Sequence, residues 1–378
     1  MRLKITLISC LAIWYSGLSQ ELALVKEDKL FGYINKSGEY AIDAQFEDAK
    51  NFSNGYAAAI KDGKWGFINP KGEWVIEPQY EKVKYFNSGY VLVSNSDQWS
   101  FINAKGETLK VPETDKFYDF EDGVSFYRSG EMVGFFNTKG EVVLEPTYDK
   151  ILSFQNGYAK VKKGELWGII DNKGKVVIPV DYEEIGDYSP KAVWAKKNNF
   201  GLIVNGTFLP VANADKIWDF VPSSDLTYAR SNKQIGFINT KGEWVIQPQF
   251  DKARAFVNGL APVAKGKNWG YINETGSVVV DFQYKDAEVF SKDGLAPIKE
   301  KDWGFIDASG NIVIPTKYDI NSGFGGLKAM FTGESEFGFR NGLARVKLEK
   351  KWGFLNTKGE VLGNKWFENA ELFVNTQE

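Results

Sequence analysis

The composition of this 378-residue chain excludes several classes of protein before any motif is considered. The chain has no histidine, which removes histidine-based catalytic triads and histidine metal sites, and its single cysteine excludes a disulfide framework. The net charge of −3 argues against a nucleic-acid partner, because such binding depends on basic side chains that neutralise phosphates.

The first 19 residues have the layout of a secretory signal peptide. Arg2 and Lys4 precede an apolar run at 5–15, and small residues follow at 17–19. We predict a signal peptide at 1–19 with cleavage after Ser19, and therefore an exported protein that is periplasmic, on the cell surface or secreted. Lipid attachment at Cys10 is disfavoured because the apolar run continues beyond it. No later run has the length of a membrane span, so none is predicted after cleavage.

A motif of about 34 residues recurs ten times in the remaining array, 20–378. Its clearest copy is KWGFINPKGEWVIEPQY at 64–80. We number each copy from its first glycine, position 0, which usually follows a tryptophan. These positions are Gly32, Gly66, Ser100, Gly134, Gly168, Gly201, Gly236, Gly270, Gly304 and Gly353. A fixed period of this length predicts supersecondary units that stack on their neighbours.

Each copy contains the signals of a β-hairpin. Asn or Asp near position +3 and Gly at +6, as in Asn69 and Gly72, predict a type I turn closed by a glycine bulge. Short β-rich runs flank the turn, and a further strand precedes the motif. The segment after the hairpin carries recurring, mostly apolar residues at +14, +17 and +20. This spacing fits neither a strand nor a long helix, so its conformation stays open.

Aromatic residues recur at two positions of this segment. At +14 stand Phe46, Tyr80, Tyr148, Tyr182, Phe250, Tyr284, Tyr318 and Phe367. At +20 stand Phe52, Phe86, Phe120, Phe154, Tyr188, Phe256, Phe290, Phe324 and Phe373. Each ring can bury roughly 150–250 Å². Because their phase is fixed, we expect these rings to be buried between neighbouring units and to join the units into one β body.

The chain resembles the bacterial WG-repeat (KWG-type) family. The resemblance rests on WGFIN-x-KG-EWVI-P-x-Y and F-x-NG-YA, and it extends from about Glu21 to Phe373. It implies an exported array that presents a surface rather than an enzymatic activity.

The predicted fold is therefore all-β, a tandem array of about ten hairpin repeats of about 34 residues. We expect an open, twisted, solenoid-like array rather than a closed, propeller-like ring. Neither terminus visibly lends a strand to the other, and ten units exceed the roughly 4–8 blades of a propeller.

Two regions depart from the repeat. In the third unit Ser100 replaces the glycine at position 0 and Thr114 replaces the aromatic residue at +14. In the sixth unit Asp215 replaces the aromatic residue at +14. An insertion at about 325–338 lengthens the ninth unit. Insertions of this kind form loops on one face of a repeat protein, either as part of a binding surface or as tolerated surface loops.

Three recurring sets of side chains could carry chemistry. Carboxylates at +15 could supply a glycosidase pair, but their regularity favours turn capping or pairing with lysine: Glu47, Glu81, Asp115, Asp149, Glu183, Asp251, Asp319 and Glu368. Lysines at the hairpin tips lie beside a row of glutamates, and they could bind an anionic polymer or form a neutral solvated border: Lys71, Lys105, Lys139, Lys173, Lys241 and Lys358. Five further tryptophans could stack on sugars, although core positions are favoured: Trp74, Trp194, Trp218, Trp244 and Trp366.

No catalytic, cofactor-binding or metal-binding residues are predicted, and no cofactor. The favoured function is a non-enzymatic exported scaffold that binds a protein partner in the cell envelope. The alternative is a module that binds glycan or peptidoglycan, and a carboxylate-based hydrolase is the least favoured.

Overall fold

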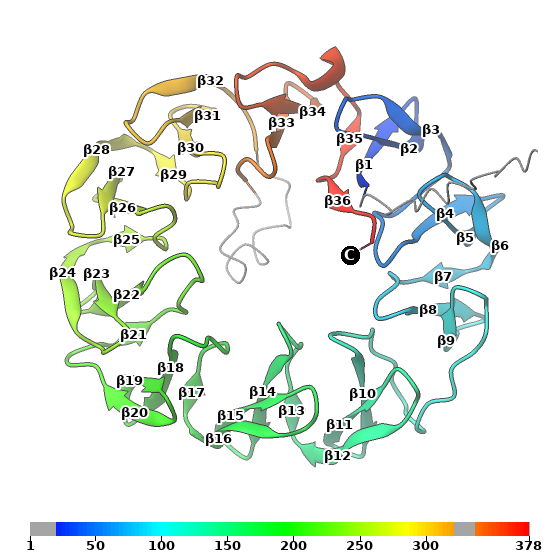
Figure 1. Cartoon of the computed structure of the whole chain (residues 1–378), viewed down its shortest axis with the longest axis horizontal. Helices are drawn as coiled ribbons and strands as arrows, with labels where there is room; N and C mark the ends of the chain where they lie inside the picture. Colours follow the sequence, from blue (N-terminus) through cyan, green and yellow to red (C-terminus); the bar gives the residue numbers. More distant parts are fainter. Residues whose placement is uncertain (1–19, 321–336, 378) are drawn as a thin grey trace, which may run out of the picture.

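The computed structural model describes residues 20–320 and 337–377. The predicted signal peptide, Cys10 and most of the insertion lie outside these residues. The described chain is a ring of small antiparallel sheets, arranged one after another in sequence order (Figure 1). No sheet in this part of the chain closes on itself as a barrel. The all-β tandem array of hairpin repeats is thus confirmed.

Each repeat begins with two antiparallel strands, which we call the first strand and the WG strand. The first strands are β1 (Glu21–Glu27), β4 (Ala57–Lys61), β8 (Tyr90–Asn95), β10 (Val124–Ser129), β14 (Tyr158–Lys163), β18 (Val193–Lys197), β22 (Leu226–Ser231), β26 (Leu260–Lys265), β30 (Ala296–Lys299) and β33 (Leu343–Leu348). The WG strands are β2 (Leu30–Ile34), β5 (Lys64–Ile68), β9 (Gln98–Asn103), β11 (Met132–Asn137), β15 (Leu166–Asp171), β19 (Asn199–Val204), β23 (Gln234–Asn239), β27 (Asn268–Asn273), β31 (Trp303–Ile306) and β34 (Lys351–Asn356).

A third strand, the outer strand, follows the hairpin turn and lies on the circumference of the ring (Figure 1). The outer strands are β3 (Tyr40–Phe46), β6 (Trp74–Tyr80), β12 (Val142–Tyr148), β16 (Val176–Tyr182), β20 (Thr207–Pro210), β24 (Trp244–Phe250), β28 (Val278–Tyr284) and β32 (Ile312–Tyr318). In the last repeat the short 3-10 helix η2 (Leu362–Asn364) follows the turn instead.

The predicted hairpin turn is present between the WG strand and the outer strand. In the seventh repeat the Gly242 N–H donates to the Asn239 carbonyl at 3.0 Å, and the Asn239 side chain accepts from the Lys241 N–H at 2.9 Å. Gly242 has a φ of +79°, and the strand register shifts just beyond the turn. These are the features of a type I turn followed by a glycine bulge.

The segment whose conformation the sequence left open contains a two-residue strand, the linking strand. Each linking strand pairs with the first strand of the next repeat, so it joins two neighbouring sheets. The linking strands are β7 (Lys82–Val83), β13 (Lys150–Ile151), β17 (Glu184–Ile185), β21 (Lys216–Ile217), β25 (Lys252–Ala253), β29 (Asp286–Ala287) and β35 (Asn369–Ala370).

The ends of the array also meet, which corrects the expectation of an open array. The linking strand of the last repeat, β35, pairs with β1 of the first, and β36 (Val374–Asn375) adds to the same strand. The register at this closure pairs Lys26 with Asn369 and Val25 with Ala370. The internal junction between β13 and β14 has the same phase. The last linking strand meets the free edge of β1 as the other linking strands meet their neighbours, and β36 extends the pairing at this junction.

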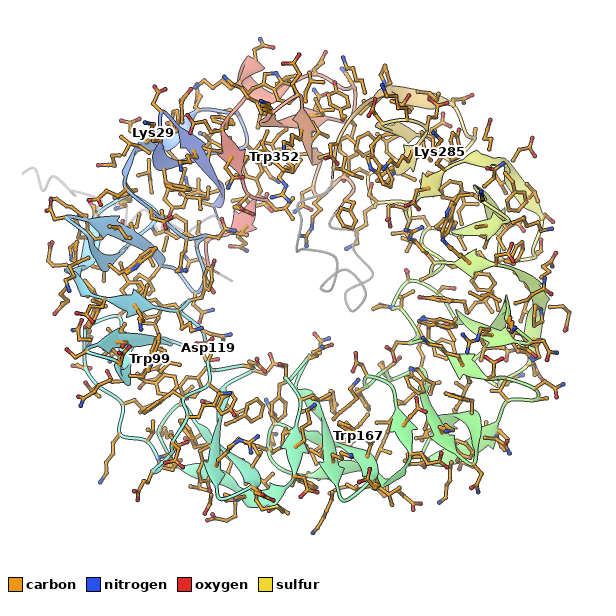
Figure 2. All side chains as sticks on the ribbon, turned by 180° about the vertical axis from the view of Figure 1, so that it is seen from behind. Lys29, Trp99, Asp119, Trp167, Lys285 and Trp352 are labelled. Atoms are coloured by element: carbon orange, nitrogen blue, oxygen red, sulfur yellow. The ribbon has the colours of Figure 1, made fainter. Side chains whose placement is uncertain are left out.

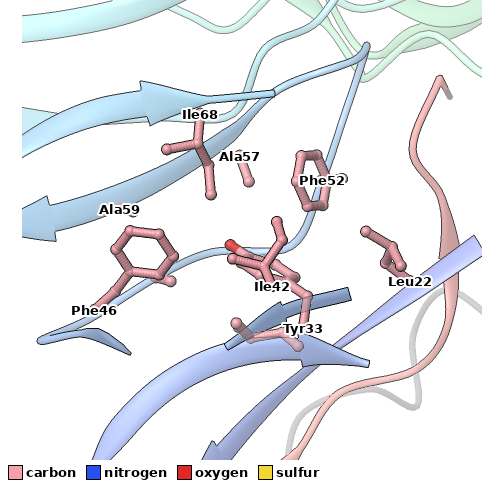
Figure 3. Close-up of a cluster of buried hydrophobic side chains, with 10 residues drawn as sticks. Leu22, Tyr33, Ile42, Phe46, Phe52, Ala57, Ala59 and Ile68 are labelled. Atoms are coloured by element: carbon pink, nitrogen blue, oxygen red, sulfur yellow. The ribbon is translucent and has the colours of Figure 1, made fainter. Parts of the chain in front are cut away.

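Side chains fill the space between neighbouring sheets around the ring (Figure 2), and many of them are aromatic. At +20 the ring contacts the aromatic residue at +1 of the same repeat, with centroids 4.7–5.3 Å apart in seven repeats. The first cluster also takes Ala57, Ala59 and Ile68 from the second repeat, around Tyr33 and Phe52 (Figure 3). The described rings at +14 and +20 are buried except for Tyr80, Tyr188 and Phe373, which are half-buried, so the predicted burial is confirmed for most of them. The predicted Phe324 lies outside the described residues, and in the ninth repeat Phe339 packs on Phe305.

The glycine of the WG pair is required by close backbone packing. A Cβ on Gly236 or Gly134 would lie 2.3 Å from a carbonyl oxygen of the outer strand, Ile246 O or Leu144 O. The third repeat has Ser100 at this position. There the chain after the hairpin turn makes only an isolated bridge, Ile102 with Thr108, and no outer strand forms in that described stretch. The loss of the glycine and the loss of the strand therefore coincide.

Replacing Gly236 with alanine is expected to lower the free energy of unfolding by about 3 kcal/mol, since overpacking against rigid backbone costs about 1–3 kcal/mol and ladder hydrogen bonds are lost as well. Urea unfolding measures the change. Gly266→Ala is the matched control: its φ is +61° and an added Cβ meets no atom within 4 Å. It should cost only about 1 kcal/mol, from the backbone conformation. Equal losses in the two variants would contradict the packing argument.

Candidate binding surface on the inner wall

The loops that follow the linking strands turn toward the centre of the ring, and we call them the inner wall (Figure 1). Many contain an Asn-Gly pair. Asn54 and Gly55 both have positive φ, +49° and +88°, and Ser53 and Tyr56 exchange backbone hydrogen bonds of 3.0 and 3.2 Å. This is a two-residue type I′ turn. The sequence showed the Asn-Gly signal, but we interpreted it only as the start of a strand.

Side chains of these turns hydrogen-bond to the next turn along the ring. Asn54 Oδ1 accepts from the Gly89 N–H at 3.1 Å, Ser88 Oγ from the Gly123 N–H at 3.1 Å and Asp122 Oδ2 from the Gly157 N–H at 2.7 Å. The acceptor is always the first residue of one turn, and the donor is the glycine of the next. The inner wall is therefore cross-linked from repeat to repeat, and it can present a fixed surface.

A cavity of about 1160 Å³ opens on the inner wall. Its lining comes from the first two repeats and from the sixth to the tenth, so residues far apart in sequence share one surface. Small-molecule pockets are commonly about 300–1,000 Å³. Because this cavity is larger than that range, its size favours a segment of a macromolecular ligand over a small molecule.

The lining combines an exposed aromatic side chain with charged residues, several of which are paired within the wall. Tyr85 is 48% exposed and lines the cavity. Arg345 pairs with Glu371 at 3.1 Å, and Glu21 forms an ion pair with Lys36 and accepts from Asn341 Nδ2 at 2.8 Å. Because these charges are compensated within the wall, apolar and hydrogen-bonding contacts remain available to a ligand.

A second cavity, of about 50 Å³, lies among the fourth to sixth repeats. Tyr158, Lys160, Asp187, Tyr188 and Asp219 are among its lining residues. Lys160 Nζ is 2.6 Å from Asp187 Oδ1, and the Asp187 backbone N–H donates to Asp219 Oδ1 at 3.0 Å. Burial, and secondarily the negative charge of Asp187, raise the pKa of Asp219 to about 6. Sequence reasoning missed this cluster because its members come from different repeats.

A partly buried group of ion pairs joins the seventh and eighth repeats. Arg254 contacts Glu288 at 2.9 Å and Asp286 at 3.1 Å, and its guanidinium lies 4.4 Å from the Trp269 ring centroid. Burial raises the pKa of Glu288 to about 7, although the Arg254 charge opposes this. Because each acid is in contact with the arginine, we assign the group to the junction between repeats and not to ligand binding.

Four of the eight carboxylates at +15 cap a turn of the following repeat, as their regularity indicated. Asp149 Oδ2 accepts from the Gly164 N–H at 2.6 Å and Asp251 Oδ2 from the Gly266 N–H at 2.6 Å. Glu81 and Glu183 make the equivalent bonds to Ser96 and Asn198 at 2.9 and 2.8 Å. Each of these four carboxylates serves a different turn, so they do not form the close pair that a glycosidase requires.

The hairpin tips form a solvated border. Lys71 and Glu73 are exposed, and Glu73 accepts from the side chain of Asn69 at 2.8 Å. The tryptophans outside the WG position are partly buried. Trp74, Trp194, Trp244 and Trp366 pack against hydrophobic clusters, and Trp218 stacks on Tyr228 with centroids 4.7 Å apart. These positions agree with the prediction that the five tryptophans pack in the core and do not form exposed stacking surfaces for sugars.

Residues 20–320 and 337–377 contain no group of three or more acidic or cysteine side chains arranged to hold a metal ion. Within the same ranges, no helix is both long enough and apolar enough to cross a membrane.

The family described as WG containing repeat matches eight segments of the chain: 31–65, 65–99, 134–167, 167–199, 235–269, 269–302, 303–320 and 337–352. These segments together cover more than half of the sequence. No curated protein matches it.

Several solved structures are similar in outline. A eukaryotic initiation factor is 12% identical, with a TM-score of 0.46, over 94% of this chain and 98% of that one. The extracellular domain of a putative one component system, BT4673 from B. thetaiotaomicron, is 10% identical, with a TM-score of 0.29, over 89% of this chain and 57% of that one.

Proposed function

Because the chain belongs to the family of WG-containing repeat proteins, we propose that it is a non-enzymatic binding scaffold that holds a protein partner against the inner wall of its ring. The cavity of about 1160 Å³ carries this proposal. Its lining gathers loops from distant repeats and includes the exposed ring of Tyr85. Tyrosine is among the side chains that most often dominate protein–protein binding energy.

Two further observations support a binding role over catalysis. The chain has no histidine, and the +15 carboxylates considered for hydrolysis are used to cap turns. The signal-like segment at 1–19 supports a place of action in the cell envelope or outside the cell.

The test is capture of a partner from cell-envelope extracts by immobilised protein, with a pair of variants. Tyr85→Ala combined with Lys292→Ala changes two exposed residues of the cavity lining. Lys71→Ala combined with Lys105→Ala changes two exposed hairpin tips as a matched control. We expect the native ring and the control to retain the same protein, and the inner-wall variant to lose at least about 90% of it. Equal retention by the two variants would place binding elsewhere, and repeated failure to retain any specific protein would overturn the proposal.

A further inference from the structure

The junctions around the fifth repeat depart from the pattern of most other junctions. Position +18 is glycine, Gly186, and the ring at +20 is Tyr188 instead of phenylalanine. The following loop, Ser189-Pro190-Lys191, lacks the Asn-Gly turn. A position at which one repeat departs from the pattern of the others is a candidate functional site.

Gly186 allows two polar groups to approach the backbone closely. A Cβ at this position would lie 2.3 Å from Asp219 Oδ1 and 2.4 Å from Trp194 Nε1. Any side chain here would displace the Asp219 carboxylate. The absence of a side chain therefore permits the small cavity of about 50 Å³ to have a carboxylate in its wall.

The charges around this cavity do not balance. One ammonium, Lys160 Nζ, faces two carboxylates, and it contacts Asp187 directly at 2.6 Å. Burial raises the pKa of Asp219 more than its polar neighbours lower it, and these are the Asp187 N–H at 3.0 Å, the Lys160 charge and the Trp194 indole N–H. With a pKa of about 6, Asp219 is ionised at pH 7.5, and a largely buried carboxylate without its own cation is unfavourable. A cation that enters the cavity would offset this cost.

The other walls suit a small cation. Tyr158 and Tyr188 stack with ring centroids 3.7 Å apart, and Ser153, Gln155 and Ser189 add hydroxyl and amide oxygens. Aromatic faces attract cations within about 6 Å of the ring. The space accommodates a primary ammonium group more readily than a branched ligand, and Gln155 and Asn156 place the cavity on the inner wall.

We propose that the cavity between Tyr158, Tyr188, Asp187 and Asp219 receives the ε-ammonium group of a lysine side chain presented by the partner inside the ring. This inference rests on the proposed function for the identity of the partner, but the pocket can be tested without one. Lys160 positions Asp187, and Asp219 supplies the carboxylate that pairs with the incoming ammonium.

The experiment is calorimetric titration of the whole mature protein with Nα-acetyl-lysine amide at pH 7.5. Nα-acetyl-norleucine amide, which lacks the ammonium, is the control ligand. We expect the lysine probe to bind and the norleucine probe not to bind. Lowering the pH to 5 protonates most of the Asp219 population and should weaken binding by up to about ten-fold, since roughly one ionised carboxylate in ten remains. A merely structural Asp219 would not give this pH profile.

Two variants complete the test. Asp219→Asn should reduce affinity at least ten-fold and remove most of the pH dependence, whereas Asp149→Asn, which removes an exposed turn-capping carboxylate, should leave binding unchanged. The Asp219 variant keeps a hydrogen-bond acceptor for the Asp187 N–H, and circular dichroism checks its fold. No binding of the lysine probe, equal binding of norleucine, or an unaffected Asp219 variant would each overturn the pocket. The partner-capture experiment tests the proposed function separately. Capture of a partner without binding of the lysine probe would mean that the pocket proposal fails while the proposed function holds.

Discussion

A chain that ends at Glu368 is expected to lose the closed ring and at least about 3–5 kcal/mol of stability. The deletion removes β35 and β36, which pair with β1. Buried Arg345 would lose the Ala370 carbonyl at 3.0 Å and the Glu371 carboxylate at 3.1 Å. Breaking a buried ion pair typically costs about 3–5 kcal/mol, and Phe354 also loses its contact with Phe373.

Urea unfolding and small-angle X-ray scattering would measure the two consequences. The radius of gyration should rise, because the first and last repeats are expected to separate. A circular permutant provides the control: the Thr376 N–H donates to the Gln20 carbonyl at 2.9 Å, so a short linker can join these residues. New ends at Gly130, in the turn between β10 and β11, where an added Cβ meets no atom within 4 Å, leave the pairing of β35 with β1 intact. The permutant should keep native stability. A truncated chain with unchanged stability and radius would mean that closure contributes nothing.

Local chemistry made much of this architecture predictable. Asn69 and Gly72 specify their turn whatever surrounds them, because the side-chain acceptor and the positive φ act within a few residues. The fixed phase of the rings at +14 and +20 predicted burial, since a position that is aromatic in most copies is expected to meet the same neighbour in each. The regular +15 carboxylates predicted turn capping for the same reason.

Ring closure could not be predicted in this way. Linking strands such as β13 and β35 have only two residues, too few to show an alternating pattern. Whether ten repeats meet depends on the small rotation between neighbours, which arises from packing across each junction. The same limit hid the cluster of Asp187 and Asp219, which belong to different repeats. Its available signal was the departure at Gly186 and Tyr188 from the rule of the other units.

Phe154→Ala is expected to lower the free energy of unfolding by about 3–5 kcal/mol, as buried phenylalanine truncations do. Its side chain contacts Phe126 and Phe135 at centroid distances of 5.9 and 5.3 Å, and its cluster includes Ala159 and Val161 of the next repeat. The variant would leave a void where two repeats meet. The loss should therefore weaken the junction as well as the fourth repeat itself.

Lys71→Ala is the control for the loss of unfolding free energy that is expected for Phe154→Ala. Lys71 is exposed at a hairpin tip, and exposed substitutions usually change stability by less than about 0.5 kcal/mol. Urea unfolding of both variants measures the difference, and amide hydrogen exchange in β14 and β15 shows whether the void in the Phe154 variant is transmitted to the fifth repeat. Similar losses in the two variants would mean that the rings at +20 do not join the repeats. Lost protection confined to the fourth repeat would mean that each repeat is stable by itself, and the ring would then be a chain of independent sheets instead of one cooperative body.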